Sequence, residues 1–122
     1  SRQSSGRNTG KVIELYQYSE RYAGLTEHQI KQREAMGLEI PSPPKYSYTA
    51  NSILSAYNTI ARSRRYEQGT PLALGAEDIK SYLELYELPC ELHIFTECVF
   101  ALDNKHLDKA HKLLSRRAKK ST

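Results

Sequence analysis

The sequence predicts an all-α protein, a small bundle of about five helices, and three observations support this prediction. Apolar residues recur three and four positions apart in several segments, which is the spacing of one helix face. Glycine or proline separates these segments, at places where helices commonly end. Thr26 and Gln29 have the spacing of a capping box, which marks a helix start. The 122 residues have the size of a single domain.

The N-terminal end predicts a flexible basic arm followed by helices. Residues 1–10 are polar or glycine, and Arg2 and Arg7 have no acidic residue among them. Because this stretch offers little apolar surface to bury, we expect it to lie outside the fold. A short N-terminal helical pair is expected at residues 11–38. Its first helix should end at Gly24, since glycine readily takes the positive φ that follows a helix.

The second helix of this pair has the clearest local signal in the chain. Thr26 is expected to cap the helix and Gln29 to reciprocate, while Leu25 and Ile30 have the spacing of a hydrophobic staple. Gly37 fits the position after the helix end. Because the other side chains between these positions are mainly polar, we expect this helix to pack only lightly.

The rest of the chain predicts a strap and a core domain. Residues 39–48 hold three of the five prolines and predict a stiff proline-rich strap. A core helical domain is expected at residues 49–117, followed by a basic tail at 118–122. Pro89 fits the first turn of the last core helix. The three core helices are expected at residues 49–65, 76–88 and 89–117.

Charge is distributed unevenly along the chain, although the net charge is only +4. The middle segment, residues 77–103, is acidic, and both ends are basic. Such asymmetry is compatible with contact to nucleic acid, with head-to-tail self-association, or with solvated ends. The candidate contacts for nucleic acid or an acidic partner are Arg2, Arg7, Lys112, Arg116, Arg117, Lys119 and Lys120.

The residues show no constellation that is typical of an enzyme or a metal site. Cys90, His93 and Glu97 share one face of the predicted helix, but structural zinc sites use four ligands, usually from separate segments. No P-loop follows the glycines, and no nucleophile stands beside a base. No apolar run is long enough to span a membrane. We therefore expect no enzymatic activity, no cofactor and no membrane span.

Binding to DNA is the main alternative that the sequence leaves open. Residues 76–101 have the outline of a helix-turn-helix, with the turn near Pro89. The candidate recognition helix is acidic and offers no cation to phosphate, which disfavours reading of the major groove. Non-specific contact with the DNA backbone stays open, through the basic ends helped by Arg62, Arg64 and Arg65.

Four short pieces of the chain between residues 40 and 107 follow a recognisable layout. They are Pro41-Ser42-Pro43-Pro44, then Ile53-Leu54-Ser55-Ala56-Tyr57 with Arg62 and Arg65, then Pro71 with residues 76–82, and finally Ala101-Leu102-Asp103 with Leu107. This layout resembles that of a group of small tailed-bacteriophage proteins encoded among the virion-morphogenesis genes. The chain differs from that group in lacking tryptophan and in carrying His106 where the group has an aromatic residue.

The resemblance implies a non-enzymatic morphogenesis or virion-associated protein that binds phage structural proteins of the tail, portal or tape-measure type. It also suggests that the chain can form a homo-oligomeric ring, and that it is located in the virion or the host cytoplasm. Arg62, Arg65, Asp103 and Tyr57 would then serve as partner-binding or ion-pair residues. For Asp103 the alternative is an ion pair with an arginine of the first core helix, which would stabilise the bundle. The competing function is a small basic DNA-binding accessory protein in phage packaging or ejection.

Overall fold

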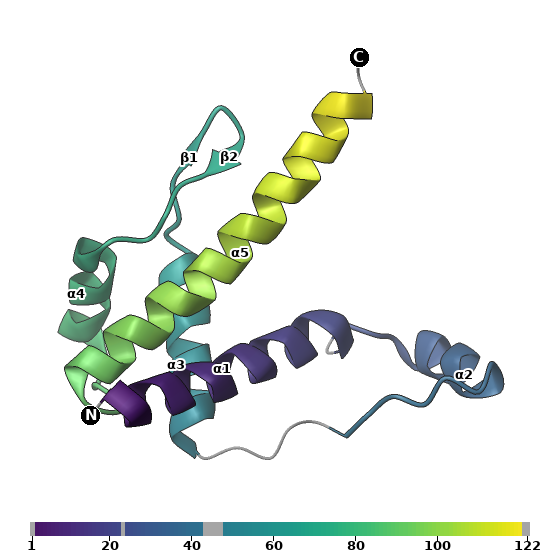
Figure 1. The fold of residues 1–122 in the computed structure, drawn as a ribbon, viewed down its shortest axis with the longest axis horizontal. Helices are drawn as coiled ribbons and strands as arrows, with labels where there is room; N and C mark the ends of the chain where they lie inside the picture. The colour runs from purple at the N-terminus through teal and green to yellow at the C-terminus, as the bar shows by residue number, and fades with distance from the viewer. Residues whose placement is uncertain (1, 23, 43–47, 121–122) are drawn as a thin grey trace.

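The computed structural model describes residues 2–22, 24–42 and 48–120, and the side chains of residues 9–22, 24–42 and 48–117. This part of the chain is mostly helical, which confirms the all-α prediction. Every described helix is too short or too polar to cross a membrane. The elements are α1 (Arg2–Tyr22), α2 (Glu27–Ala35), α3 (Tyr48–Ala61), β1 (Tyr66–Glu67), β2 (Thr70–Pro71), α4 (Ala76–Leu85) and α5 (Leu92–Lys120) (Figure 1).

The hydrophobic core lies where α1, α3 and α5 cross (Figure 1). Burying one large apolar side chain contributes roughly 1.5–3 kcal/mol, so this crossing supplies much of the stability. The helix that completes the crossing is α1, whereas α4 lies at its flank and buries Ile79. The core side chains include Val12 and Tyr16 of α1, Ile53, Tyr57 and Ile60 of α3, and Phe95, Cys98, Val99 and Leu102 of α5.

The helices α1 and α5 lie side by side and run in the same direction. Thr9 Oγ1 lies 3.7 Å from Cys98 Sγ near their starts. About three turns further along both helices, Lys109 Nζ lies 3.0 Å from Glu20 Oε2. Both pairs are 89 residues apart in the sequence. The constant separation shows that the two helices stay in register over this length.

The expected flexible arm at residues 1–10 is wrong for the residues that the structure describes, because residues 2–10 belong to α1. Glycine and serine are poor helix formers, which is why the sequence pattern favoured an arm. Packing overrides this preference: Val12 is 1% exposed, and its burial against the rest of the core stabilises a helix that then continues toward the N-terminus.

The helix α2 stands away from the crossing of the other helices and buries none of its residues, as the light packing expected for it implies (Figure 1). Its capping box is present: Thr26 Oγ1 accepts from the Gln29 N–H at 3.2 Å, and Gln29 Oε1 accepts from the Thr26 N–H at 2.9 Å. At the other end Gly37 has a φ of 78°, and the Leu38 N–H donates to the Arg33 carbonyl at 2.8 Å. Local sequence therefore defines both ends of α2.

The strap ends one residue earlier than predicted, because α3 begins at Tyr48. Of the strap, residues 39–42 are described and residues 43–47 lie outside the described part. The carbonyl of Pro41 accepts a hydrogen bond from the Tyr18 hydroxyl at 2.9 Å. The strap therefore returns to α1 before it enters α3.

A small hairpin lies between α3 and α4, in a stretch for which the sequence predicts no helix or strand. Strand β1 pairs antiparallel with β2, with Tyr66 opposite Pro71 and Glu67 opposite Thr70. The two turn residues have positive φ, 52° at Gln68 and 80° at Gly69. Two-residue turns of this kind match the twist of a hairpin, and Asn-Gly is their usual sequence. Gln-Gly is a weaker signal, which is why the sequence pattern did not reveal the hairpin.

The last three helices differ from the expected boundaries. α3 ends at Ala61, α4 ends at Leu85 and α5 begins at Leu92. Pro89 lies in the turn between α4 and α5. Proline disfavours helical geometry at the residue before it, so α4 ends before Pro89. α5 continues through Asp103 as one helix, as expected. Beyond residue 103, however, no described side chain of α5 is buried, so the apolar stripe leaves the core there.

Candidate functional site

A buried polar network joins the end of α3, the hairpin and α5. Arg64 Nη2 donates to Asp103 Oδ1 at 2.5 Å, and both side chains are 3% exposed. Arg64 Nη1 also donates to the Leu72 carbonyl at 2.8 Å. Asp103 Oδ2 accepts from the Leu74 N–H at 2.9 Å. The ion pair therefore also holds the segment between β2 and α4 against the bundle.

The hydroxyl of Tyr57 completes this network. Tyr57 Oη accepts from Arg64 Nη2 at 3.1 Å and donates to Asp103 Oδ1 at 3.4 Å. Burial, and then the negative charge of Asp103, raise the pKa of Tyr57 well above its ordinary value. The hydroxyl therefore stays protonated and remains a donor. The rings of Tyr16 and Tyr57 meet edge to face with centroids 6.1 Å apart, which links the network to α1.

The structure brings together two of the four predicted ion-pair residues, Tyr57 and Asp103, and leaves the other two outside. Arg62 and Arg65 are exposed, and Arg64 takes the position beside the carboxylate. The sequence left open that Arg64 helps the basic ends to contact the DNA backbone, but its side chain is buried and paired with Asp103. The ion pair belongs to the interior of the bundle, where its two charges neutralise each other.

One sequence signal points to Arg64. Ile53, Tyr57, Ile60 and Arg64 follow one another at intervals of four, three and four residues, so Arg64 continues the buried stripe of α3. The charge of the side chain concealed this signal, because arginine is rarely buried without a partner.

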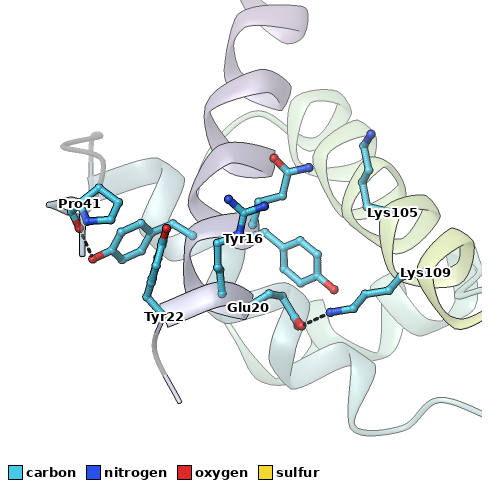
Figure 2. Close-up of a pocket in the computed structure, with 9 residues that line it drawn as sticks. Tyr16, Glu20, Tyr22, Pro41, Lys105 and Lys109 are labelled. Atoms are coloured by element: carbon cyan, nitrogen blue, oxygen red, sulfur yellow. Dashed lines mark hydrogen bonds and ion pairs between the residues drawn. The ribbon is translucent and has the colours of Figure 1, made fainter. Parts of the chain in front are cut away.

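An open groove of about 660 Å³ lies between the C-terminal half of α1, Pro41 of the strap and the middle of α5 (Figure 2). We call it the α1–α5 groove. Its lining combines aromatic rings and cations from segments that are distant in the sequence. The lining residues are Tyr16, Gln17, Tyr18, Glu20, Arg21, Tyr22, Pro41, Lys105 and Lys109.

The two lysines of the α1–α5 groove have different surroundings. Figure 2 shows Lys105 and Lys109 on α5 opposite Tyr16 and Glu20 on α1. Lys109 is paired with Glu20 at 3.0 Å. Among the described side chains, no carboxylate lies within ion-pair distance of Lys105 or of Arg21. The groove therefore presents two cations that form no ion pair with any of the described side chains.

The tyrosines of the α1–α5 groove are held by contacts within the chain. Tyr16 is buried, and burial together with the Glu20 carboxylate raises the pKa of its hydroxyl to about 12. The rings of Tyr18 and Tyr22 lie 4.9 Å apart between centroids, and the Tyr18 hydroxyl is fixed on Pro41. Tyrosine offers apolar contact area and a polar tip, and arginine can bind a carboxylate or phosphate through two parallel hydrogen bonds. The groove can therefore bind an anionic group that is attached to apolar surface.

Sequence reasoning did not find the α1–α5 groove. Tyr18, Arg21 and Tyr22 share one face of α1, since they lie three and four positions apart. That pattern could have suggested half of the groove. The other half comes from Lys105 and Lys109, and only the packing of α5 beside α1 places them there.

The predicted basic contacts at the ends of the chain lie away from the groove or outside the described side chains. Lys112, Arg116 and Arg117 are exposed on α5 beyond the groove. Arg2 and Arg7 lie on α1, and Lys119 and Lys120 at the end of α5, but these four side chains are outside the described part of the structure.

Metal-ligating residues do not gather in the part of the chain that the structure describes. No group of three or more histidine, cysteine, aspartate or glutamate side chains is placed to hold a metal ion there. Cys90 precedes the start of α5, so it does not share a helix with His93 and Glu97 as the sequence pattern had suggested. Cys90 and Cys98 are both free thiols.

The fold and the site define a small all-α protein with a buried ion-pair network and an open groove lined by aromatic and basic residues. We compared the chain with protein-family models, with curated proteins and with solved structures, and none of the three comparisons gave a match.

Proposed function

We propose that this chain is a non-enzymatic assembly protein that binds an acidic segment of a structural protein in the α1–α5 groove. The observation that carries the proposal is the pair of cations, Arg21 and Lys105, beside three tyrosine rings in one open groove. Arginine and tyrosine are enriched in the residues that contribute most to protein–protein binding. An acidic side chain of the partner would pair with these cations beside the tyrosine rings, which would give the complex affinity and fix the orientation of the partner.

The resemblance of residues 40–107 to small phage proteins suggests which partner to test. A tail, portal or tape-measure protein of a tailed bacteriophage would supply the acidic segment, in the virion or in the host cytoplasm. Pro41, which belongs to the phage-like strap, forms one wall of the groove. The strap would therefore contribute directly to binding as well as connecting α2 to α3.

The test is binding of the chain to candidate tail, portal and tape-measure proteins that are produced together with it. The wild-type chain is expected to form a stoichiometric complex on size-exclusion chromatography. The double variant Arg21→Glu with Lys105→Glu should weaken that complex at least tenfold, because both cations of the groove become anions. A matched control is Lys31→Glu with Arg62→Glu, which makes the same charge change at exposed positions away from the groove.

Two results would overturn the proposal. Equal binding by the groove variant and the control would show that the α1–α5 groove is not the binding site. Failure of every phage structural protein to bind the wild-type chain would remove the assembly function itself. Mass spectrometry of purified particles would then add whether the protein is retained in the virion and at what copy number.

A DNA-binding accessory function in packaging or ejection is the second candidate, and one observation favours it. Lys105, Lys109, Lys112 and Arg116 follow one another at intervals of four, three and four residues, so they form a basic row along α5. Each phosphate contact contributes a slope of about −0.9 to the salt dependence of binding to duplex DNA. The variant Lys112→Gln with Arg116→Gln should lower that slope by about 2 if this row binds the backbone.

The two candidate functions respond differently to salt. A protein complex that survives high salt supports the assembly function, because buried contacts are screened little. A shift of mixed-sequence DNA that disappears at high salt and in the Lys112→Gln, Arg116→Gln variant supports the accessory function.

A further inference from the structure

Stacked aromatic rings connect the core to the surface beside α4. The rings of Phe95 and Tyr82 lie 5.9 Å apart between centroids. The rings of Tyr82 and Tyr86 lie 4.7 Å apart and are nearly parallel, with 17° between their planes. Phe95 is fully buried, whereas Tyr86 is 51% exposed. Contact with Tyr82 therefore places an aromatic ring at the surface of the bundle, where a ligand can reach it.

Two open hollows lie between α3 and α4, and both have Tyr82 and Tyr86 in their linings. The larger hollow has a volume of about 610 Å³ and is formed by α3 and by the segment that follows α4. The smaller hollow, of about 460 Å³, extends toward the turn after α3. Because the two hollows share both rings, we treat them as one surface and call it the α3–α4 groove.

The α3–α4 groove follows one face of α3. Tyr48, Ser52, Ser55 and Thr59 line it at intervals of four, three and four residues. At 1.5 Å per residue, Tyr48 and Thr59 are about 16 Å apart along the helix. A polyproline II helix rises about 3.1 Å per residue, so this length accommodates about five of its residues. The groove is therefore long enough for a short extended peptide.

The lining of the larger hollow suits a proline-rich ligand. Tyr48 is 88% exposed, and Leu88 and Pro89 add apolar surface beside it. The hydroxyls of Tyr48 and Ser52 can donate hydrogen bonds. A polyproline II helix has no internal hydrogen bonds, so its carbonyls accept from such donors while its apolar rings pack on aromatic side chains. Aromatic-lined grooves are the usual binding sites for such segments.

The charge of the larger hollow selects a basic ligand. Among the described residues of its lining, Glu87 alone is charged at neutral pH. No cation of the described side chains lies within ion-pair distance of Glu87. This carboxylate repels phosphate, which disfavours nucleic acid, and attracts a lysine or arginine of the ligand.

We propose that the α3–α4 groove binds a proline-rich segment of a partner protein in the polyproline II conformation, with a basic residue of that segment beside Glu87. The rings of Tyr48 and Tyr86 contact the prolines of the segment. Because a polyproline II segment is extended before it binds, it loses little conformational entropy on binding. The site is separate from the α1–α5 groove, since it uses neither Arg21 nor Lys105 and takes a ligand of the opposite charge.

Fluorescence anisotropy with a labelled synthetic peptide tests the proposal. The probe consists of seven prolines with a lysine at each end, so that either direction of binding brings a lysine near Glu87. One comparison peptide has glycines in place of the prolines, and another has glutamates in place of the lysines. The wild type should bind the probe about tenfold more tightly than the glycine peptide, which lacks both the rings and the pre-formed helix.

Two variants test the aromatic contacts. Tyr48→Ser and Tyr86→Ser should each weaken binding of the probe about tenfold, because each removes a ring. Since Tyr48 is 88% exposed, Tyr48→Ser should keep the helical circular dichroism and melting temperature of the wild type, and it remains decisive if loss of the Tyr86 ring disturbs α4. Tyr66→Ser is the matched control, because Tyr66 is 63% exposed on β1 and lies outside the lining of the groove.

Glu87→Lys tests the charge of the groove. The variant should bind the lysine-ended probe about threefold more weakly and the glutamate-ended peptide about threefold more tightly than the wild type does. A purely structural effect of the substitution would weaken binding of both peptides. Glu34→Lys makes the same charge change at an exposed position of α2 and should leave both affinities unchanged.

Four results would overturn the proposal. They are the absence of binding at millimolar probe, equal affinity for the proline and glycine peptides, equal binding by Tyr48→Ser and the wild type, and tighter binding of another class of ligand. The last result is checked with a single-stranded DNA of mixed sequence and with cellohexaose, each as a competitor of the probe.

Discussion

Arg64 and Asp103 are 39 residues apart in the sequence and form an ion pair in the interior, with Arg64 Nη2 2.5 Å from Asp103 Oδ1. The pair connects the turn that follows α3 to the middle of α5, and its other hydrogen bonds go to the Tyr57 hydroxyl and to the backbone of Leu72 and Leu74. Because both charges are removed from water, each depends on the other for compensation. The pair therefore fixes how the hairpin segment and α5 lie on α3.

We predict that Asp103→Asn destabilises the protein by about 3–5 kcal/mol, because it leaves the Arg64 charge buried without its counter-ion. Tyr57→Phe should cost about 1–2 kcal/mol, since it removes one hydroxyl that both accepts and donates in the network. Unfolding in urea measures both changes. Arg62→Gln is the control and should stay within about 0.5 kcal/mol of the wild type, because Arg62 is exposed.

The double variant Arg64→Met with Asp103→Leu removes both buried charges. It tests whether the instability of Asp103→Asn comes from leaving one charge without its partner. Replacing both charges with apolar groups should recover much of the stability that Asp103→Asn loses. A double variant as unstable as the single variant would contradict this account. It would show instead that the backbone hydrogen bonds to Leu72 and Leu74 carry the effect.

Gly10→Ala tests the extension of α1 to the N-terminus. Gly10 lies inside α1, and a Cβ added there meets no atom within 4 Å. Alanine should therefore stabilise the protein by roughly 0.5–1 kcal/mol, since glycine is a poor helix former. Thermal unfolding checks this, with Gly37→Ala as the contrast. That substitution should destabilise, because Gly37 has a φ of 78°. If Gly10→Ala left the stability unchanged, residues 2–10 would be better described as a flexible arm.

Thr26→Ala should loosen α2 without unfolding the bundle. The substitution removes the side-chain oxygen that accepts from the Gln29 N–H, which costs about 1 kcal/mol of helix stability. Because α2 buries none of its residues, the loss should stay local. Amide hydrogen exchange should therefore quicken in residues 27–35 and remain unchanged in α3. Thr26→Ser retains the cap and should exchange like the wild type; a fall in global stability with Thr26→Ala would show that α2 supports the core.

The lowered pKa of His106 predicts how the stability of the protein depends on pH. Burial, and then the charge of Arg64, lower the pKa of His106 below its ordinary value of 6.5, while weaker influences come from Asp103, Glu20 and Lys109. As the pH falls below 6.5, the unfolded chain takes up the proton more readily than the folded one. Stability should therefore be greatest above that pH and decrease toward acid.

The measurement compares the urea midpoint at about pH 7.5 and about pH 5.5 for the wild type and for His106→Gln. The variant should lose less stability between these two values, because it removes the group that takes up the proton on unfolding. An identical loss in both proteins would assign the acid dependence to other groups. His28, at an exposed position of α2, provides the control as His28→Gln.

Local signals in the sequence were sufficient for much of the secondary structure. The capping box at Thr26 and the glycine after α2 depend on atoms a few residues apart, so they form whatever surrounds them. The apolar stripes of α3 and α5 likewise identify each helix and its buried face. These interactions are short in range, which is why residue order determines them.

The tertiary structure decided what long-range packing controls. Only packing shows that α1 completes the core, that it extends to Arg2, and that Gln68 and Gly69 turn a hairpin. It also decides that Asp103 pairs with Arg64 while Arg62 and Arg65 stay in water. The α1–α5 groove exists because two helices 89 positions apart lie in register. The distribution of charge along the sequence does not predict that register. The register depends on which apolar helix faces bury the most surface against each other.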